Sequence, residues 1–317
     1  MTEAAANTRP DFVTLTDWLA RHRYAGDPPR RRWLVEGVFP LAQPSLIAAG
    51  GGIGKSYLLL ALARAVAADD GLDGWINAPK LFGGTVTENG QAVYITAEDD
   101  LIEVHNRLRS LGEIPDRLYV VPLPDAGGAV PLFAVEPYTK APAKTAAWDA
   151  LVKQLTEFQN LRLVTLDPLQ PLCTLDLNVP ENAQFVCSRL SALAALTGAA
   201  IIVSHHFAKR EASTPEQARE AIRGTGGLVD GVRAVYALWP PKEDQAKAIC
   251  KALGIEHVRG MVVSGGVVKA NGRANLRVTV FVRDARGLLC DRSAELSVTK
   301  PDDTQLLPSL RLAIADT

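Results

Sequence analysis

A glycine-rich loop between two apolar runs is the feature that most constrains how this chain can fold. Residues 45–67 read SLIAAGGGIGKSYLLLALARAVA, which matches the phosphate-binding pattern G-x-x-x-x-G-K-[ST] except that Ala49 stands at the first glycine. In this pattern the glycines let backbone N–H groups point at phosphates, the lysine reaches the β- and γ-phosphates, and the hydroxyl joins a Mg²⁺ shell. The residues expected to bind ATP are Gly50, Gly51, Gly52, Ile53, Gly54, Lys55, Ser56 and Tyr57.

The sequence on either side of the loop is typical of a strand followed by a helix. Residues 45–49 are apolar, and residues 57–68 are rich in alanine and leucine and contain no helix breaker. A helix that begins at the loop would add the partial positive charge of its N-terminus to the phosphate site. A plain glycine-rich turn is the alternative, but it leaves the Gly-Lys-Ser sequence without a role. We therefore predict nucleotide binding, and we expect a small residue at position 49 to be tolerated.

Composition limits the other classes to which the chain could belong. Its 317 residues are 47% hydrophobic and 22% charged, which is ordinary for a soluble globular protein. We expect a cytoplasmic protein without a membrane segment, because no apolar run approaches about 20 residues and the first residues lack a signal peptide's apolar core. The four cysteines have no metal-ligand spacing. With a net charge of −1, any nucleic-acid binding would depend on local basic loops or on a channel formed by several subunits.

The order of patterns along the chain predicts an α/β fold. The expected strands and helices cover residues 91–97, 161–167 and 199–206 (strands) and 99–112, 145–160 and 183–198 (helices). Their alternation favours a mostly parallel, doubly wound sheet. From residue 259 a two-residue periodicity predicts antiparallel strands that extend the edge of this sheet.

The chain divides by composition into a polar, basic N-terminal arm (1–32), an ATPase domain (33–290) and a C-terminal tail (291–317). Two stretches inside the expected domain, 122–142 and 209–227, are rich in glycine, proline or charge and predict long loops. Long loops in compact domains are often functional.

One acidic residue stands where a metal-bound nucleotide would need it. Asp167 ends the apolar stretch 161–167, and ligands of parallel sheets collect at the carboxyl ends of the strands. From there the carboxylate could hold Mg²⁺ through water, opposite Ser56. The alternative is a capping aspartate before Pro168.

A second acidic residue, Glu98, follows the strand expected at 91–97 and would project at the same edge, where it could activate water. Asp99 and Asp100 are interpreted as the N-cap and first turn of the following helix. For Glu98 the alternative is a solvated carboxylate at a helix start.

Two histidines end the strand expected at 199–206. A histidine at this edge could hydrogen-bond the γ-phosphate and report its loss to the loop that follows. Neighbouring residues of a strand point to opposite faces, so His205 and His206 cannot chelate one ion together. An ordinary pair of core or surface histidines is the alternative.

Several further stretches accompany the loop in a fixed order along residues 40–275. They are GGIGKSYLLLALA, VYITAED with HNRLRSLG, LVTLD, IIVSHHFAK, RGTGGLVDGVRAVYAL and VVKANG. In sequence and spacing this set resembles the RepA-type hexameric replicative helicases of broad-host-range plasmids, which belong to the RecA-like ATPase superfamily. The resemblance implies a RecA-like P-loop NTPase core and a ring in which ATP lies between neighbouring subunits. Residues 1–32 and those after about residue 290 have no counterpart in it.

The resemblance also implies a role for each matching residue. Lys55 and Ser56 would bind the phosphates and Mg²⁺. Glu98 would be the catalytic base, Asp167 the metal-associated acid and His206 the γ-phosphate sensor. Arg233 is similar to the family's arginine finger, and Lys269 resembles a basic residue that also reaches across the interface. A cation supplied by a neighbour makes hydrolysis depend on the relative position of two subunits. For both cations a surface salt bridge is the alternative.

The leading hypothesis is an ATP-driven ring that moves on single-stranded DNA and unwinds duplex during plasmid, phage or mobile-element replication. The two long loops would face its channel, and the candidates for DNA contact are Lys140, Lys209, Arg210, Arg219 and Arg223. Six copies of a few cations would give a salt-sensitive, sequence-independent grip. Because the loops contain few aromatics besides Phe133 and Tyr138, we expect electrostatic tracking more than base stacking. A replication initiator or primase is a possible further partner.

Two other functions fit the same loop. A RecA-like ATPase could act as a nucleotide-dependent switch on a protein partner or in recombination, without unwinding DNA. A small-molecule kinase is a weaker alternative, since it leaves Arg233, Lys269 and the paired histidines without roles. A motor requires a closed ring and an ATPase stimulated by single-stranded DNA, whereas a switch could be monomeric and indifferent to DNA.

Overall fold

The computed structural model describes residues 15–68, 80–208, 212–222 and 226–298. The chain divides into two units, Met1–Arg32 and Trp33–Thr317. The first contains a 3₁₀ turn at Leu15–Trp18 and a single α-helical turn, α1, at Ala20–Arg23.

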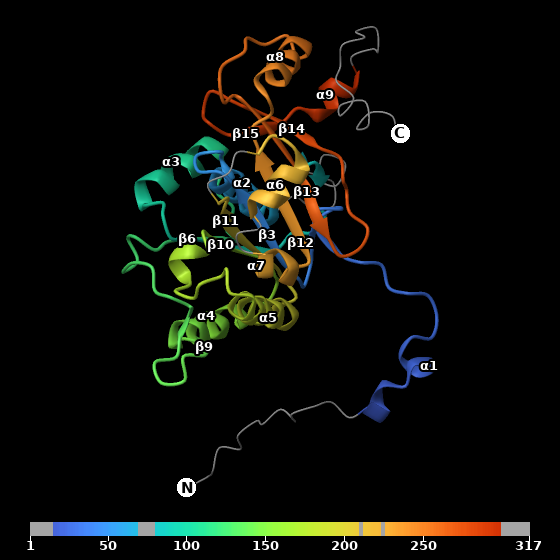
Figure 1. The fold of residues 1–317 in the computed structure, drawn as a ribbon, viewed down its shortest axis with the longest axis vertical. Helices are drawn as coiled ribbons and strands as arrows, with labels where there is room; N and C mark the ends of the chain where they lie inside the picture. The colour runs from blue at the N-terminus through green and yellow to red at the C-terminus, as the bar shows by residue number, and fades with distance from the viewer. Residues whose placement is uncertain (1–14, 69–79, 209–211, 223–225, 299–317) are drawn as a thin grey trace. The chain divides into compact units, whose positions relative to one another are not determined.

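A nine-stranded sheet forms the centre of the described part of the second unit (Figure 1), in the order β15-β14-β13-β12-β3-β11-β10-β6-β7. Strands β12, β3, β11, β10, β6 and β7 are parallel, whereas β13, β14 and β15 continue the sheet with antiparallel pairing. The strands span Pro44–Ala49 (β3), Gln91–Thr96 (β6), Leu118–Pro122 (β7), Leu161–Asp167 (β10), Ala200–His206 (β11), Ala234–Trp239 (β12), Val262–Ala270 (β13), Thr279–Arg283 (β14) and Leu289–Asp291 (β15).

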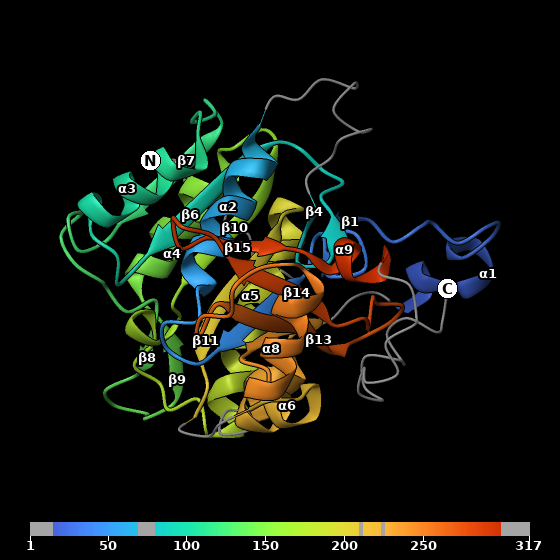
Figure 2. The same ribbon diagram turned by 90° about the horizontal axis from the view of Figure 1, so that it is seen from above.

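Helices cover both faces of this sheet (Figures 1 and 2). Helices α2 (Lys55–Ala67) and α3 (Leu101–Leu111) lie on one face, and α4 (Ala146–Thr156), α5 (Pro180–Thr197), α6 (Pro215–Ile222) and α7 (Gly226–Gly231) lie on the other. Helix α8 (Glu243–Ala252) packs on β13, and α9 (Ser293–Val298) packs on β14. None of the helices in the described residues is long and apolar enough to cross a membrane.

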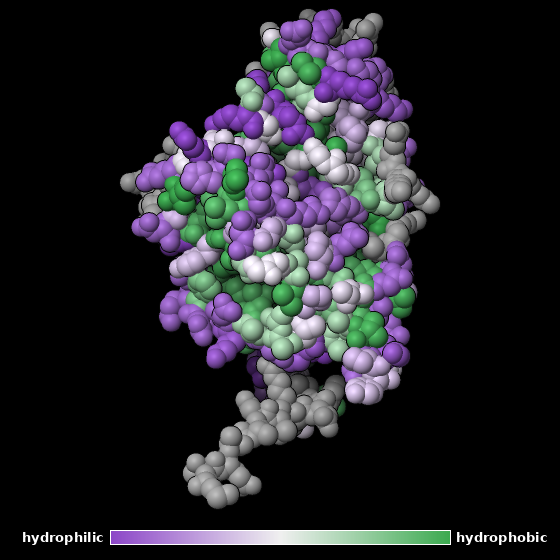
Figure 3. Space-filling view, turned by 90° about the vertical axis from the view of Figure 1, so that its left-hand side faces the viewer, coloured by the Kyte–Doolittle hydropathy of each residue, from purple (hydrophilic) through white to green (hydrophobic). Residues whose placement is uncertain are grey.

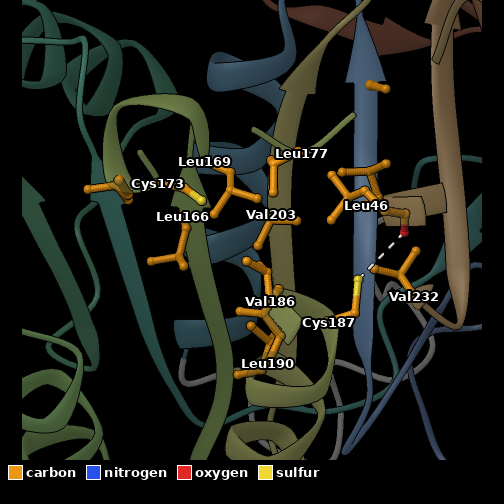
Figure 4. Close-up of a cluster of buried hydrophobic side chains, with 14 of the residues drawn as sticks. Leu46, Leu166, Leu169, Cys173, Leu177, Val186, Cys187, Leu190, Val203 and Val232 are labelled. Atoms are coloured by element: carbon orange, nitrogen blue, oxygen red, sulfur yellow. Dashed lines mark hydrogen bonds between the residues drawn. The ribbon is translucent and has the colours of Figure 1, made fainter. Parts of the chain in front are cut away.

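Successive side chains of the central strands serve the two faces in turn, as the pleat of a strand requires. Leu46 belongs to the buried cluster that faces α5, whereas the next residue, Ile47, belongs to the cluster that faces α2. Figure 4 shows the α5 side, where Leu46 and Val203 of neighbouring strands lie beside Val186 and Leu190 of α5. Burial on both faces explains why these strands are continuous apolar runs in the sequence.

The predicted fold class is confirmed. The structure is an α/β fold whose large, mostly parallel sheet is flanked by helices and extended by antiparallel strands near the C-terminus. The strands expected at 91–97, 161–167 and 199–206 are β6, β10 and β11. Helix α5 ends before Gly198, which adopts a left-handed conformation with φ of 70°.

The prediction of two long irregular loops is wrong in part. Stretch 122–142 contributes to a β-hairpin of β8 (Phe133–Val135) and β9 (Pro142–Lys144), and stretch 209–227 contains α6. Phe133 is fully buried, with its ring centroid 4.7 Å from that of Trp148, so it is not available to stack on a base. The hairpin escaped prediction because its strands are too short to show a period and are surrounded by glycine and proline.

Short strands and a C-terminal extension complete the fold. Two small hairpins pair β1 (Trp33–Val35) with β2 (Phe39–Pro40) and β4 (Lys80–Leu81) with β5 (Gly84–Thr85). The domain boundary expected at residue 290 falls inside β15, and packed structure continues beyond it. The Val280 N–H donates to Ser293 Oγ at 2.9 Å, which ties the start of α9 to β14.

Candidate nucleotide-binding site

The glycine-rich loop connects β3 to α2 as the sequence predicts. Ala49 is the last residue of β3 and is fully buried in extended backbone, a position that needs no glycine. Gly52 and Gly54 have φ angles of 71° and 111°, in the left-handed region that favours glycine. A Cβ atom on Gly54 would also lie 3.1 Å from Leu289 Cδ1. The departure from the usual pattern therefore falls where glycine is not required.

Lys55 is the first residue of α2, and its ammonium group lies over the loop. The side chain is only 5% exposed, and Nζ lies 3.3 and 3.4 Å from two loop carbonyl oxygens and 3.4 Å from His206 Nδ1. Burial lowers the pKa of Lys55, whereas the nearby carboxylates of Asp167 and Glu98 raise it. A buried cation with only long hydrogen bonds to the protein is well suited to bind phosphate.

Asp167 lies at the carboxyl end of β10, where its two oxygens are already hydrogen-bonded. The Tyr94 hydroxyl donates to Oδ2 at 2.6 Å, and the Ser204 hydroxyl donates to Oδ1. Burial and the Asp167 carboxylate raise the pKa of Tyr94 well above its ordinary value, so this hydroxyl keeps its proton. The same hydroxyl lies 3.4 Å from the backbone oxygen of Ser56. Asp167 is thus placed to act on an ion near Ser56 through water.

This arrangement fits a Mg²⁺ ion that arrives with a nucleotide. In the described residues no group of three or more histidine, cysteine or acidic side chains could hold a metal by itself. A Mg²⁺ ion would instead be held by the Ser56 hydroxyl, water and phosphate oxygens, which are the hard ligands that it prefers. The chemistry that it would supply is neutralisation of phosphate charge.

Glu98 and His206 lie on one wall of the same cavity. Glu98 follows β6, and its Oε1 lies 3.7 Å from Nε2 of His206 at the end of β11. Both residues line a cavity of about 490 Å³ together with Lys55 and Ser56. Burial, with smaller contributions from His206 and Lys55, lowers the pKa of His205 to about 4, so its imidazole is neutral at pH 7. Of the two histidines, His206 is the one that lines the cavity beside Lys55.

The two aspartates after Glu98 differ from one another. Asp100 is the N-cap of α3, because its Oδ1 accepts a hydrogen bond from the Glu103 N–H at 2.8 Å. The helix therefore begins one residue later than expected, and the interpretation of Asp99 as the N-cap and Asp100 as the first turn is wrong. The Asp99 carboxylate forms an ion pair with Arg107 NH1 at 2.5 Å and lines the cavity. Burial raises the pKa of Asp99, and the charge of Arg107 lowers it.

Sequence reasoning missed three arginines that line this cavity, Arg107, Arg283 and Arg286. Arg107 follows Asp99 by eight residues, about two helical turns, which is the one signal that could have linked it to the site. Arg283 NH2 donates to the backbone oxygen of Ile53 in the loop at 2.9 Å, across 230 residues of sequence. No local pattern predicts a contact at that separation.

The comparison with known families agrees with this geometry. A model of the AAA_25 family, described as an AAA domain, matches residues 9–212 of the chain. The chain belongs to the AAA_25 family of AAA domains. It is therefore a P-loop ATPase, and nucleotide binding follows from its family as well as from its loop. The matched range contains the loop, Glu98, Asp167 and His206, and it ends before Arg233 and Lys269.

The two cations expected from a neighbouring subunit, Arg233 and Lys269, lie at the end of this AAA domain's sheet that is opposite to the glycine-rich loop. Arg233 precedes β12, and its N–H donates to the oxygen of Pro44 at the start of β3, whereas the loop follows the end of β3. The five residue steps along β3 from Pro44 to Ala49 correspond to about 16 Å. Lys269, paired with Val235, lies at the same edge as Arg233. Neither cation can reach the loop of its own chain.

The surroundings of these two cations differ. Arg233 is exposed, and within the described part of the chain its guanidinium makes no hydrogen bond or ion pair, so the alternative of a surface salt bridge finds no support there. Lys269 donates to the backbone oxygens of Val232 and, at 3.2 Å, Asp230. Burial lowers the pKa of Lys269; among its neighbours Asp230 raises that pKa and Arg233 lowers it. Lys269 therefore has a structural role at the end of α7 in the single chain.

Of the five candidates for DNA contact, two are described. Lys140 lies in the turn between β8 and β9, with a positive φ of 60°. Arg219 is exposed on α6, close enough to Lys269 to lower the pKa of that lysine. Lys209, Arg210 and Arg223 lie outside the described residues.

Replacing the predicted base tests its role directly. We expect Glu98→Gln to lower the rate of ATP hydrolysis by about 100-fold or more while nucleotide binding is retained, because a general base acts on the water and not on the ground-state nucleotide. Steady-state hydrolysis and equilibrium ADP binding measure the two effects. Asp100→Asn is the matched control, because asparagine can still cap α3. Equal loss in both variants would remove Glu98 from the catalytic set.

Proposed function

We propose that this AAA domain is a ring-forming motor that hydrolyses ATP with Mg²⁺ and moves along single-stranded DNA. In this proposal six copies form the ring, and the motion unwinds duplex DNA in the cytoplasm during plasmid, phage or mobile-element replication. The observation that carries the proposal is the position of Arg233 and Lys269 at the sheet edge opposite the phosphate-binding loop.

This position makes a single chain incomplete as a catalyst. Lys55, Glu98 and His206 gather around one cavity, whereas the cation expected to stabilise the transferred phosphoryl group lies about 16 Å away along the sheet. A head-to-tail contact between copies brings different surfaces of the chain together, and it closes into a ring if the rotation allows. Such a contact would place Arg233 of one copy at the loop of the next.

The same geometry supports coupling between ATP hydrolysis and DNA contacts. The segment after Asp167 begins at the Mg²⁺ side of the cavity, and the segment after His206 begins at the expected γ-phosphate. Lys209 and Arg210 follow His206 within four residues. Loss of the γ-phosphate would therefore act first on the start of the segment that carries these DNA-contacting cations. With Phe133 buried, charge remains the main source of grip, and six copies multiply a small number of cations.

The DNA dependence of hydrolysis is the experiment that tests this function. We expect excess single-stranded DNA to raise the steady-state ATPase rate of the assembled protein several-fold, with weaker stimulation at higher salt because phosphate contacts release counterions. Duplex DNA of equal length is the control ligand. Hydrolysis by an assembled ring that is indifferent to DNA would contradict the motor and would favour a nucleotide-dependent switch. A loading partner such as an initiator or primase would be sought only after stimulation is seen.

A further inference from the structure

The nucleotide cavity has a second wall that the phosphate chemistry does not use. Beyond the loop, Glu98 and His206, it is lined by residues of α3 and by the turn after β14. These further lining residues are Asp99, Glu103, Asn106, Arg107, Ser110, Arg283, Arg286 and Gly287. A cavity of about 490 Å³ is larger than a triphosphate alone requires and lies in the range of sites that hold whole small-molecule ligands.

One side of helix α3 supplies most of this wall. Glu103, Asn106, Arg107 and Ser110 follow the helical spacing of three and four residues, so their side chains share one face. The adjacent flank of the helix is anchored, because Val104 and Leu108 are buried. Figure 3 faces the side of Figure 1 on which α3 lies, and polar and apolar side chains are interspersed there. The face of α3 toward the cavity, by contrast, is entirely polar.

The turn between β14 and β15 closes the cavity at its far end. Arg283 donates to the oxygens of Ile53 and Gly287 at 2.9 and 3.0 Å, which fixes the turn against the phosphate-binding loop. Arg286 NH1 donates to the backbone oxygen of Ser110 at 2.8 Å and joins the turn to the end of α3. Strands β6 and β11, which lead to Glu98 and His206, lie on one side of β3, and β14 lies on the other. The γ-phosphate end and the turn are therefore opposite ends of the cavity.

The polar groups of this wall are largely committed, with one exception. Arg107 is paired with Asp99 and Glu103, at 2.5 and 2.8 Å, and Arg286 is paired with Asp284 as well as Ser110. The side-chain amide of Asn106 makes no hydrogen bond to any described residue and is exposed in the cavity. It is therefore a group with both a donor and an acceptor to offer a ligand.

We propose that the α3 face and the β14–β15 turn hold the nucleoside, and that Asn106 selects adenine. An amide side chain presents a donor and an acceptor side by side, which matches the amino group and ring nitrogen of adenine, whereas guanine is usually read by arginine or lysine. Arg107 and Arg286 are engaged by carboxylates and Arg283 by backbone oxygens, so among the described residues of this wall the Asn106 amide is the group left to contact the base. The inference rests on the assignment of the phosphate-binding loop and does not depend on DNA or on ring formation.

Binding without hydrolysis tests this selection. Calorimetric titration of the full chain would compare ADP, GDP and inorganic tripolyphosphate, each with Mg²⁺. We expect the wild type to prefer ADP and Asn106→Asp to shift the ADP-to-GDP affinity ratio toward GDP by about tenfold, because a carboxylate accepts from guanine but repels the ring nitrogens of adenine. Tripolyphosphate affinity should stay the same in the variant. His105→Asp adds the same carboxylate to the neighbouring, exposed position of α3 outside the cavity wall and should leave the ratio unchanged.

Two results would overturn the proposal. One is an unchanged ADP-to-GDP ratio in Asn106→Asp when tripolyphosphate still binds. The other is an equal shift in His105→Asp, which would show a general effect of charge on α3. Failure of the wild type to bind tripolyphosphate or ADP would instead reject the phosphate-binding loop, which is a separate failure.

Discussion

Lys55→Ala is expected to abolish ATP hydrolysis and to weaken binding of ADP severely. The ammonium group lies 3.3 to 3.4 Å from loop carbonyls on a side chain that is only 5% exposed, so its attraction for phosphate is poorly screened. Loss of such a charge-assisted contact, together with its stabilisation of the transition state, should lower the hydrolysis rate by about 1,000-fold or more.

The same substitution should not destabilise the fold. Burial lowers the pKa of Lys55, which shows that the folded chain disfavours its charge, and its weak partners are mostly backbone carbonyls. We therefore expect the melting temperature of Lys55→Ala without nucleotide to equal or exceed that of the wild type. Lys247→Ala, which removes an exposed lysine of α8, is the control. Near-normal ADP binding by a folded Lys55→Ala protein would contradict the assignment of the loop.

Arg233→Ala has the second large expected effect, and it should separate hydrolysis from binding. An arginine that neutralises the transferred phosphoryl group contributes about 10³- to 10⁵-fold to the rate. We expect a loss of about 1,000-fold in hydrolysis with ADP affinity unchanged, because Arg233 lies at the sheet edge away from the loop of its own chain. Thermal stability should also be unchanged, since the guanidinium makes no hydrogen bond or ion pair within the described residues.

The control for Arg233→Ala is Arg259→Ala, which removes another exposed arginine outside the strands. Parallel rate and binding measurements on the two variants would show whether the effect belongs to position 233. Retention of most of the hydrolysis rate in Arg233→Ala would show that Arg233 is not an arginine finger. A loss of ADP affinity equal to the loss of rate would place Arg233 in the binding site of its own chain.

The sequence predicts those parts of the site that lie at the carboxyl ends of the parallel strands. Glu98, Asp167 and His206 each follow or end an apolar run, and parallel strands deliver their carboxyl ends to one place. The loop itself is predictable because its glycines and lysine are contiguous.

Other parts of the site depend on packing between distant segments. Arg283 meets Ile53 only because β14, a strand of the same sheet, runs in the direction of β3, and no local pattern in the sequence encodes that arrangement. The burial of Phe133 follows from the positions of Trp148 and Phe185, which come from two separate helices. The contacts of Lys269 with the end of α7 likewise arise from tertiary structure, although its position on a strand was recognisable from the resemblance.

Hydrolysis by a mixture of two inactive variants tests the central claim most directly. Lys55→Ala and Arg233→Ala chains would be assembled together in equal amounts, and the ATPase rate would be compared with those of each variant alone. If the loop and the arginine of one site come from different copies, about one quarter of the interfaces in a mixed ring carry both groups, and hydrolysis returns to a comparable fraction of the wild-type rate. A mixture no more active than its separate components, with mixed assembly demonstrated, would contradict the shared site.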